Sequence, residues 1–230
     1  MSSAEPRPVS PPVSVEALIK AARSLGGMTV GELGDTLGVQ VPLDQRRAKG
    51  LVGNLLERAL GATAGSKSLP DFPELGVELK SIPVNAAGRP QESTFVCTIP
   101  LADVADTEWA QSRVAAKLAR VLFVPVESVK GLPLPQRRIG YAMLWIPSAE
   151  EASLLRADWY EMAGYIGRGD ADQITGHMGQ CLQIRPKGQN GADLKKAPES
   201  EGAWQLTMGR GFYLRAGFTK AVLARLRTEA

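Results

Sequence analysis

The stretch that most constrains the fold is VELKSIPV at residues 77–84, because it has the pattern of a β-strand with turn signals on both sides. A segment rich in Gly, Ser and Pro precedes it at residues 61–76, and the turn NAAGRPQ follows it at 85–91. The next residues, ESTFVCTIPL at 92–101, again resemble a strand, so the two strands predict a β-hairpin. Upstream, residues 51–60 have the apolar spacing of an amphipathic helix that a glycine ends. Helices and strands are mixed here, and an α/β fold is expected.

The rest of the chain shows the same mixture. Residues 15–25 predict a helix, and a short second helix starts at a capping box in which Thr29 is followed by Glu32. Further predicted elements are, in chain order, a basic helix over 109–120, strands over 121–126 and 141–148, a long helix capped by Ser148, strands over 180–187 and 211–218, and a closing helix capped by Thr219. Residues 1–13 are expected to form a flexible leader, and residues 14–230 a single domain.

Composition excludes several classes of protein. No apolar run in the 230 residues approaches the roughly 20 that cross a bilayer, and the leader lacks the pattern of a secretory signal. A cytoplasmic protein without membrane association is therefore expected. Cys97 and Cys181 are isolated from each other, which favours buried, reduced thiols. Because His177 is the single histidine, zinc sites and Cys/His catalysis are poorly supplied, and any catalytic metal must bind to carboxylates.

The charge is unevenly distributed although the net value is only +3. Residues 110–140 hold six cations and one acid, Glu127, and the stretch from Ala203 to the C-terminus is also mainly basic. Two basic regions in a nearly neutral chain suggest a surface that faces a polyanion. Ordinary solvated faces explain the same pattern equally well.

Three polar residues stand close together in DFPELGVELK, at residues 71–80. Side chains alternate along a strand, so Glu78 and Lys80 project from one face. Asp71 precedes the strand across a turn at Pro73 and Gly76, near enough for its carboxylate to return toward Glu78. Two converging carboxylates suit a hard cation such as Mg²⁺, and a neighbouring lysine can stabilise charge on a phosphate. Together these groups are suited to metal-assisted phosphodiester hydrolysis, although the same spacing is common on exposed strands.

A third acid strengthens this interpretation. Glu57 falls among the leucines of the predicted helix at 51–60, where a charge is costly unless it meets a cation.

Longer stretches of the chain match the pattern of a known family. They are LLERALGATAGSKSLPDFPELGVELKSIPV, RPQESTFVCTIPL after it, and KLARVLFVPVE, LPLPQRRIG, LQIRPK and GRGFYLRAGFT. In these stretches the chain resembles the MutH family of mismatch-repair endonucleases. The resemblance extends from about residue 14 through nearly the whole chain. The sequence departs from the family pattern mainly in the leader, in the loop at 188–202 and in the C-terminal tail, which weakens any inference about partner contacts made through the tail.

The resemblance implies a restriction-endonuclease-like fold, in which a mixed sheet is flanked by helices and two lobes form a DNA cleft. It also implies a monomer that needs Mg²⁺, is activated by MutL and indirectly by MutS, and nicks the unmethylated strand of hemimethylated GATC sites in double-stranded DNA. The family's catalytic set falls on Glu57, Asp71, Glu78 and Lys80, with the three carboxylates as metal ligands. Lys117 matches a lysine near the family's active site, and Lys49 matches one that contacts DNA or assists catalysis.

For target recognition the resemblance points to two segments. Arg185, Pro186 and Lys187 occupy the family's recognition loop, and Tyr213 matches its recognition tyrosine. Arginine can present two donors to guanine in the major groove, and an aromatic ring can lie against the methyl group of a methylated adenine. Without the resemblance, Tyr213 is better explained as a half-buried strand aromatic.

Two alternatives to a nuclease remain. Residues 15–39 can be interpreted as a helix-turn-helix of a non-catalytic DNA-binding regulator, but the second helix has almost no side chain that could contact a base or phosphate. A catalytically dead adaptor is the other alternative. It is disfavoured because a degenerate site is expected to have lost at least one of Glu57, Asp71, Glu78 and Lys80.

Overall fold

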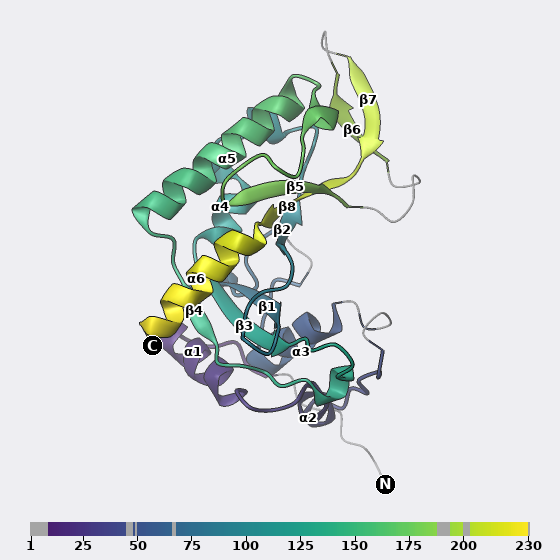
Figure 1. Ribbon diagram of the computed structural model, residues 1–230. Coiled ribbons are helices and arrows are strands. Elements are labelled where there is room, and N and C mark those ends of the chain that lie inside the picture. Colours follow the sequence, from purple (N-terminus) through teal and green to yellow (C-terminus); the bar gives the residue numbers. More distant parts are fainter. Residues whose placement is uncertain are drawn as a thin grey trace. The chain divides into compact units, whose positions relative to one another are not determined.

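The computed structural model describes residues 9–44, 48, 50–65, 68–187, 194–199 and 203–229 (Figure 1). The chain divides into two compact units, each built from separate segments. The first unit comprises Met1–Gln91, Arg120–Trp145 and Leu223–Ala230, and the second comprises Glu92–Ala119 and Ile146–Val222. The expected mixed α/β composition is confirmed. The restriction-endonuclease-like fold stays an expectation.

Helices form where the sequence predicts them, with two differences at their ends. The α-helices of the described residues are α1 (Val15–Ser24), α2 (Val30–Thr36), α3 (Leu51–Leu60), α4 (Arg113–Leu118), α5 (Ala149–Gly167) and α6 (Ala216–Thr228). The capping boxes at Thr29 and Ser148 are both present. Thr219, however, does not cap α6, because the helix begins at Ala216 and Thr219 is fully buried within it. The predicted helix at 109–120 is also shorter: a 3-10 turn, η4 (Trp109–Gln111), comes first, and Ser112 then caps α4.

The described strands form three small sheets (Figure 1). In the first unit, β1 (Glu78–Val84) pairs in parallel with β3 (Val121–Glu127), and β3 pairs antiparallel with β4 (Met143–Trp145). In the second unit, β8 (Arg210–Leu214) lies between β2 (Thr94–Thr98) and β5 (Leu182–Pro186), antiparallel to both. A separate ribbon joins β6 (Leu194–Pro198) to β7 (Trp204–Met208). Neither β6 nor β7 was expected from the sequence.

The predicted hairpin between β1 and β2 is wrong, since these strands belong to different sheets. The turn itself forms, with Asn85 N–H donating to the Arg89 carbonyl at 3.0 Å. β1 nevertheless pairs with β3, whose residues Val121–Val126 are all buried. A parallel pair of this kind is normally covered on both faces, and its two strands need a long connection. Local turn signals carry no information about such a distant partner.

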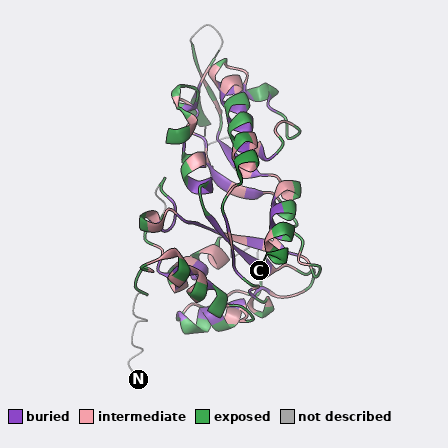
Figure 2. Cartoon of the chain, turned by 90° about the vertical axis from the view of Figure 1, so that its left-hand side faces the viewer, coloured by how far each residue is buried: buried purple, intermediate pink, exposed green. Residues whose placement is uncertain are grey.

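The core of the first unit packs α3 against β1. Leu55, Leu56 and Leu60 of the helix are buried together with Val77 and Leu79. Figure 2 shows buried residues concentrated on the strands, with exposed residues on the outer faces of the helices. At the end of α3, the backbone of Ser10 lies so close that a Cβ on Gly61 would come within 2.6 Å of its carbonyl oxygen. The backbone of Ser10, within the expected leader, therefore lies against the end of α3, while the side chains of Val9 and Val13 are exposed.

A buried carboxylate fixes the start of β5 in the second unit. Asp158 of α5 accepts hydrogen bonds from the backbone N–H groups of Gln180, Cys181 and Leu182, at 2.6 to 3.0 Å. Gly179 makes this approach possible, because a Cβ there would lie 3.2 Å from Asp158 Cγ and 2.3 Å from the Leu182 carbonyl oxygen. The position of β5, and of the residues it carries, thus depends on a contact from α5.

Both cysteines are buried free thiols, as expected. Burial, helped by the carboxylates of Asp158 and Glu151, raises the pKa of the Cys181 thiol to about 12. It therefore stays protonated at neutral pH and is a poor nucleophile. No helix in the described ranges is long and apolar enough to cross a membrane.

The Asp158 contact predicts a specific loss of stability. Asp158→Asn should lower the free energy of unfolding by about 2 kcal/mol, because an amide has one acceptor oxygen and presents its own N–H groups to backbone donors. Urea denaturation followed by circular dichroism measures the change. Glu161→Ala, an exposed carboxylate on the same helix, is the control and should change the value by less than about 0.5 kcal/mol. Equal midpoints for the two variants would contradict the proposed role of Asp158.

Candidate functional site

The loop before β1 returns the Asp71 carboxylate to the strand. The 3-10 turn η2 (Pro73–Leu75) reverses the chain, and Gly76 takes the left-handed conformation with φ of 61°. Phe72 and Val77 close the loop through two backbone hydrogen bonds. Asp71 Oδ2 then accepts a hydrogen bond of 2.8 Å from the Leu79 N–H, in a buried setting. The Asp71 carboxylate therefore lies beside the start of β1, next to the residue that follows Glu78.

Glu78 and Lys80 lie on the same face of β1, as strand alternation predicts. The Lys80 ammonium donates a 2.6 Å hydrogen bond to Glu78 Oε1. Glu78 is only 2% exposed, and Lys80 16%. Burial of a carboxylate to this extent is costly unless a cation accompanies it, and Lys80 is such a cation. The lysine still reaches solvent, so it can also approach an incoming anion.

Glu57 of α3 lies near Ser81 of β1. A Cβ on Gly53 would lie 3.9 Å from Glu57 Oε1 and 4.0 Å from Ser81 Oγ, so these two oxygens approach the same point. Asp71, Glu78 and Lys80 are gathered at the beginning of β1, and Glu57 approaches the strand from α3. The participation of Glu57 in the same chemistry stays a prediction.

The donor set is chemically suited to Mg²⁺. Within the described ranges, no three His, Cys, Asp or Glu side chains already form a group that could hold a metal ion. Asp71 and Glu78 do present buried carboxylates on adjacent segments, and carboxylate oxygens are the ligands that Mg²⁺ prefers. Mg²⁺ also keeps several of its waters and needs only one or two protein carboxylates. The chemical type and number of these two carboxylates therefore match what this ion requires.

The two remaining lysines that the sequence predicts near the site are Lys117 and Lys49. Lys117 is a buried residue near the C-terminal end of α4 in the second unit. Lys49 lies outside the described residues.

A second cluster gathers three of the predicted DNA-contacting residues, Arg185, Lys187 and Tyr213, on one face of the β2–β8–β5 sheet. The Arg185 guanidinium lies over the Tyr213 ring, 5.6 Å from its centroid. Phe95 of β2 pairs with Tyr213 of β8, and the two rings meet edge to face at 5.3 Å. The Lys187 ammonium lies 4.1 Å from the centroid of the Phe95 ring. Two cations therefore lie against two aromatic rings, and both cations are exposed to solvent. Pro186 is the exposed last residue of β5.

A β-bulge shapes this face. The register between β2 and β8 shifts between Phe95 and Cys97, which leaves Val96 as the extra residue. Val96 and Cys97 are consequently both buried, and Thr98 returns to the face that carries Phe95. Thr98 Oγ1 accepts a 2.7 Å hydrogen bond from the Lys187 ammonium, and Ser93 Oγ accepts one of 2.8 Å from Arg185.

Sequence reasoning missed Phe95, Ser93 and Thr98 as members of this cluster. All three lie in ESTFVCTIPL, whose pattern predicts a strand and no binding role. Ser93 is 92 residues from Arg185, and Thr98 is 89 residues from Lys187. No spacing rule connects such distant positions, and only the pairing of β2 and β5 with β8 brings them together.

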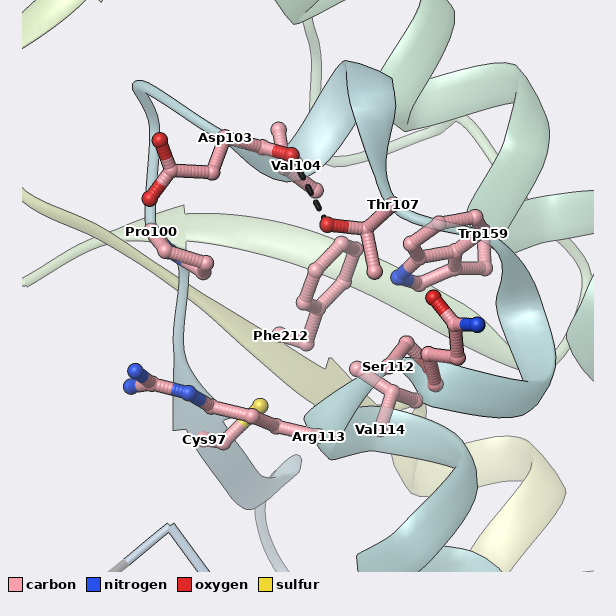
Figure 3. Close-up of a pocket in the computed structure, with 11 residues that line it drawn as sticks. Cys97, Pro100, Asp103, Val104, Thr107, Ser112, Arg113, Val114, Trp159 and Phe212 are labelled. Carbon is pink, nitrogen blue, oxygen red and sulfur yellow. Dashed lines mark hydrogen bonds between the residues drawn. The ribbon is translucent and has the colours of Figure 1, made fainter.

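A cavity of about 200 Å³ lies on the opposite side of the same sheet (Figure 3). Its lining includes Cys97, Phe212 and Trp159. Phe212 and Tyr213 are consecutive residues of β8, so their side chains point to opposite faces. The cavity is therefore separate from the cluster around Tyr213.

Comparison with known proteins identifies close relatives. The profile of a family described as "DNA mismatch repair enzyme MutH" matches residues 60–158. A DNA mismatch repair protein MutH from Serratia proteamaculans is 49% identical over 215 residues, which is 94% of each chain. The MutH proteins of Escherichia coli O9:H4 and Salmonella paratyphi B are each 48% identical, over 222 and 217 residues. These alignments cover 96% and 94% of this chain, and 97% and 94% of the relatives.

The close packing around Gly211 gives a testable prediction. A Cβ there would lie 3.0 Å from Phe95 Cε2 and 3.2 Å from both Tyr213 Cε2 and the Cys97 carbonyl oxygen, so Gly211→Ala requires these groups to shift. We expect a loss of about 1 to 2 kcal/mol in the free energy of unfolding, as for other overpacked sites, measured by urea denaturation. Gly217→Ala, where a Cβ meets nothing within 4 Å, should be neutral or slightly stabilising. A Gly211 variant as stable as the Gly217 variant would show that the rings have room to move.

Proposed function

Because the chain belongs to the MutH family, we propose that it is a magnesium-dependent endonuclease of methyl-directed mismatch repair. In this proposal it nicks the unmethylated strand of double-stranded DNA at hemimethylated GATC sites. The observation that supports the proposal most directly is the group formed by Asp71, Glu78 and Lys80 at the start of β1.

Each member of that group has a chemical role in the proposal. Asp71 and Glu78 would hold Mg²⁺ through their carboxylate oxygens, with Glu57 as a further ligand through water. When bound, this ion would supply Lewis-acid activation of the scissile phosphate and of water. Lys80 is held beside Glu78 by their ion pair, and its ammonium can stabilise negative charge that develops on the phosphate. Lys117 and Lys49 are proposed to support the backbone contact or the catalysis.

The second cluster would recognise the target. Arg185 presents a planar fork of donors that matches the acceptors of guanine. Tyr213 offers a ring edge against which a methyl group on adenine can lie. Pro186 and Lys187 follow Arg185 at the end of β5. There the exposed Lys187 ammonium can contact DNA phosphates.

The alternative of a helix-turn-helix regulator is less well supported. Val30, Leu33 and Gly34 of α2 are buried in the first unit's core, and this helix carries no basic residue. A helix in this position has few groups left for a DNA groove. A dead adaptor would have no need for the intact Asp71, Glu78 and Lys80 group.

The protein partners and the cellular location that we propose are based on membership of the MutH family. We propose that MutL activates the protein, that MutS acts through MutL, and that the protein works as a cytoplasmic monomer.

The metal assignment is tested by cleavage of supercoiled plasmid DNA carrying GATC sites. Asp71→Ala or Glu78→Ala should abolish nicking in Mg²⁺ while DNA binding in Ca²⁺ survives, because each change removes a metal ligand and no phosphate contact. Lys80→Ala should lose cleavage with metal binding largely kept, and Glu57→Ala should be impaired less uniformly. Replacing the exposed Lys20 by alanine serves as the matched control and should leave nicking unchanged. Full activity in either carboxylate variant would remove the metal-site assignment.

Strand choice is tested with three oligonucleotide duplexes that differ only in adenine methylation and are labelled on each strand. The wild-type protein should cut only the unmethylated strand of the hemimethylated duplex and be nearly inactive on fully methylated DNA. Tyr213→Phe should keep this bias because the ring remains. Tyr213→Ala should narrow the difference between unmethylated and hemimethylated substrates. Equal cutting of both strands by the wild type would overturn the proposed strand discrimination.

A further inference from the structure

Arg185 is held in place by a residue from the far side of its sheet. The side chain leaves β5, passes over the Tyr213 ring on β8 and donates a 2.8 Å hydrogen bond to Ser93 Oγ. Ser93 directly precedes β2, and β2 and β5 flank β8 on opposite sides. The Arg185 side chain therefore spans the width of the sheet and is fixed at both ends.

This support matters because arginine recognition is directional. A guanidinium contacts guanine through two donors in one plane, so its orientation decides whether both bonds form. A solvent-exposed arginine loses substantial rotamer entropy when it is ordered. The ring of Tyr213 restrains the position of the guanidinium. A ring face alone, however, does not fix the direction in which the guanidinium donors point. The hydroxyl of Ser93 supplies an acceptor at a fixed point and so selects that rotation.

The neighbouring lysine provides an internal comparison. Lys187 is held in a parallel manner, with its ammonium bound to Thr98 Oγ1 and lying against the Phe95 ring. An ammonium has no plane, however, and binds phosphate as a point charge. Loss of the Thr98 hydroxyl should therefore affect all DNA sequences alike.

We propose that Ser93 is a positioning residue that sets the sequence preference of the protein by orienting the Arg185 guanidinium before DNA arrives. The inference rests on the proposed function, in which Arg185 contacts a base edge. Ser93 acts through Arg185 and needs no base contact of its own.

Binding measurements in Ca²⁺ at fixed salt test the idea without cleavage. Fluorescence anisotropy gives the Kd for a GATC duplex and for a duplex with the guanine replaced. Ser93→Ala should reduce the preference, expressed as the Kd for the altered duplex divided by the Kd for the GATC duplex, about fivefold, as expected for loss of one hydrogen bond, with the Kd for the altered duplex unchanged. Ser93→Thr keeps the hydroxyl and should restore the ratio. Thr98→Val, the matched control at the other end of the same segment, should shift both Kd values together.

Two further measurements complete the test. Arg185→Ala combined with Ser93→Ala should show no greater loss of preference than Arg185→Ala alone, because Ser93 acts only through Arg185. In the free protein, NMR signals of the Arg185 guanidinium should show hindered rotation that disappears in Ser93→Ala and persists in Ser93→Thr. This signal does not depend on DNA.

The outcomes separate this inference from the proposed function. A wild-type protein with no preference for GATC would refute the proposed recognition, and the NMR signal would still decide whether Ser93 orients Arg185. A wild-type protein that prefers GATC, with an unchanged ratio in Ser93→Ala, would overturn the inference alone. Two results would show that Ser93 is only a structural contact. One is an equal loss of GATC preference in Ser93→Thr and Ser93→Ala, and the other is a parallel rise of both Kd values in Ser93→Ala. Either result would overturn the inference.

Discussion

The parallel pairing of β1 with β3 is the interaction on which the first unit depends. β3 is apolar and buried along nearly its whole length, and it offers β1 a partner that keeps the strand away from water. β1 can therefore hold Glu78 at 2% exposure, where the Lys80 ammonium is its ion-pair partner. The backbone of β1 also donates the Leu79 N–H that orients Asp71. The strand pairing, the ion pair and the returned carboxylate thus form a single arrangement.

The chemistry at the start of β1 was predictable because its parts are close in sequence. Asp71 and Glu78 are joined by one tight loop, whose direction Pro73 and Gly76 determine locally. Alternation along a strand places Glu78 and Lys80 on one face whatever the strand's partner. The helix ends at Thr29, Gly61 and Ser148 were predictable for the same reason, since capping depends on residues three or four positions away.

Features that depend on distant segments were not predictable. The turn after β1 has every local sign of a hairpin, yet β2 pairs with β8, more than 100 residues later. Strict alternation from Phe95 predicts that Thr98 lies on the opposite face of the sheet. The bulge at Val96 instead places Thr98 on the same face as Phe95. Thr219 has the chemistry of a helix cap but lies inside a helix that starts at Ala216. The role of Arg185 was suggested by family resemblance, and the hydroxyl that holds its side chain was visible only in the folded sheet.

The division of the chain into interleaved segments affects how the molecule can fold during synthesis. The polypeptide passes from one unit to the other four times, at residues 91/92, 119/120, 145/146 and 222/223. The first unit contains both the earliest segments and the C-terminal turns of α6, where Leu223 is completely buried. Neither unit corresponds to a continuous stretch that a ribosome could release as a finished domain. We therefore expect the native state of both units to form only after the last helix has emerged, and no single truncation point to yield either unit intact.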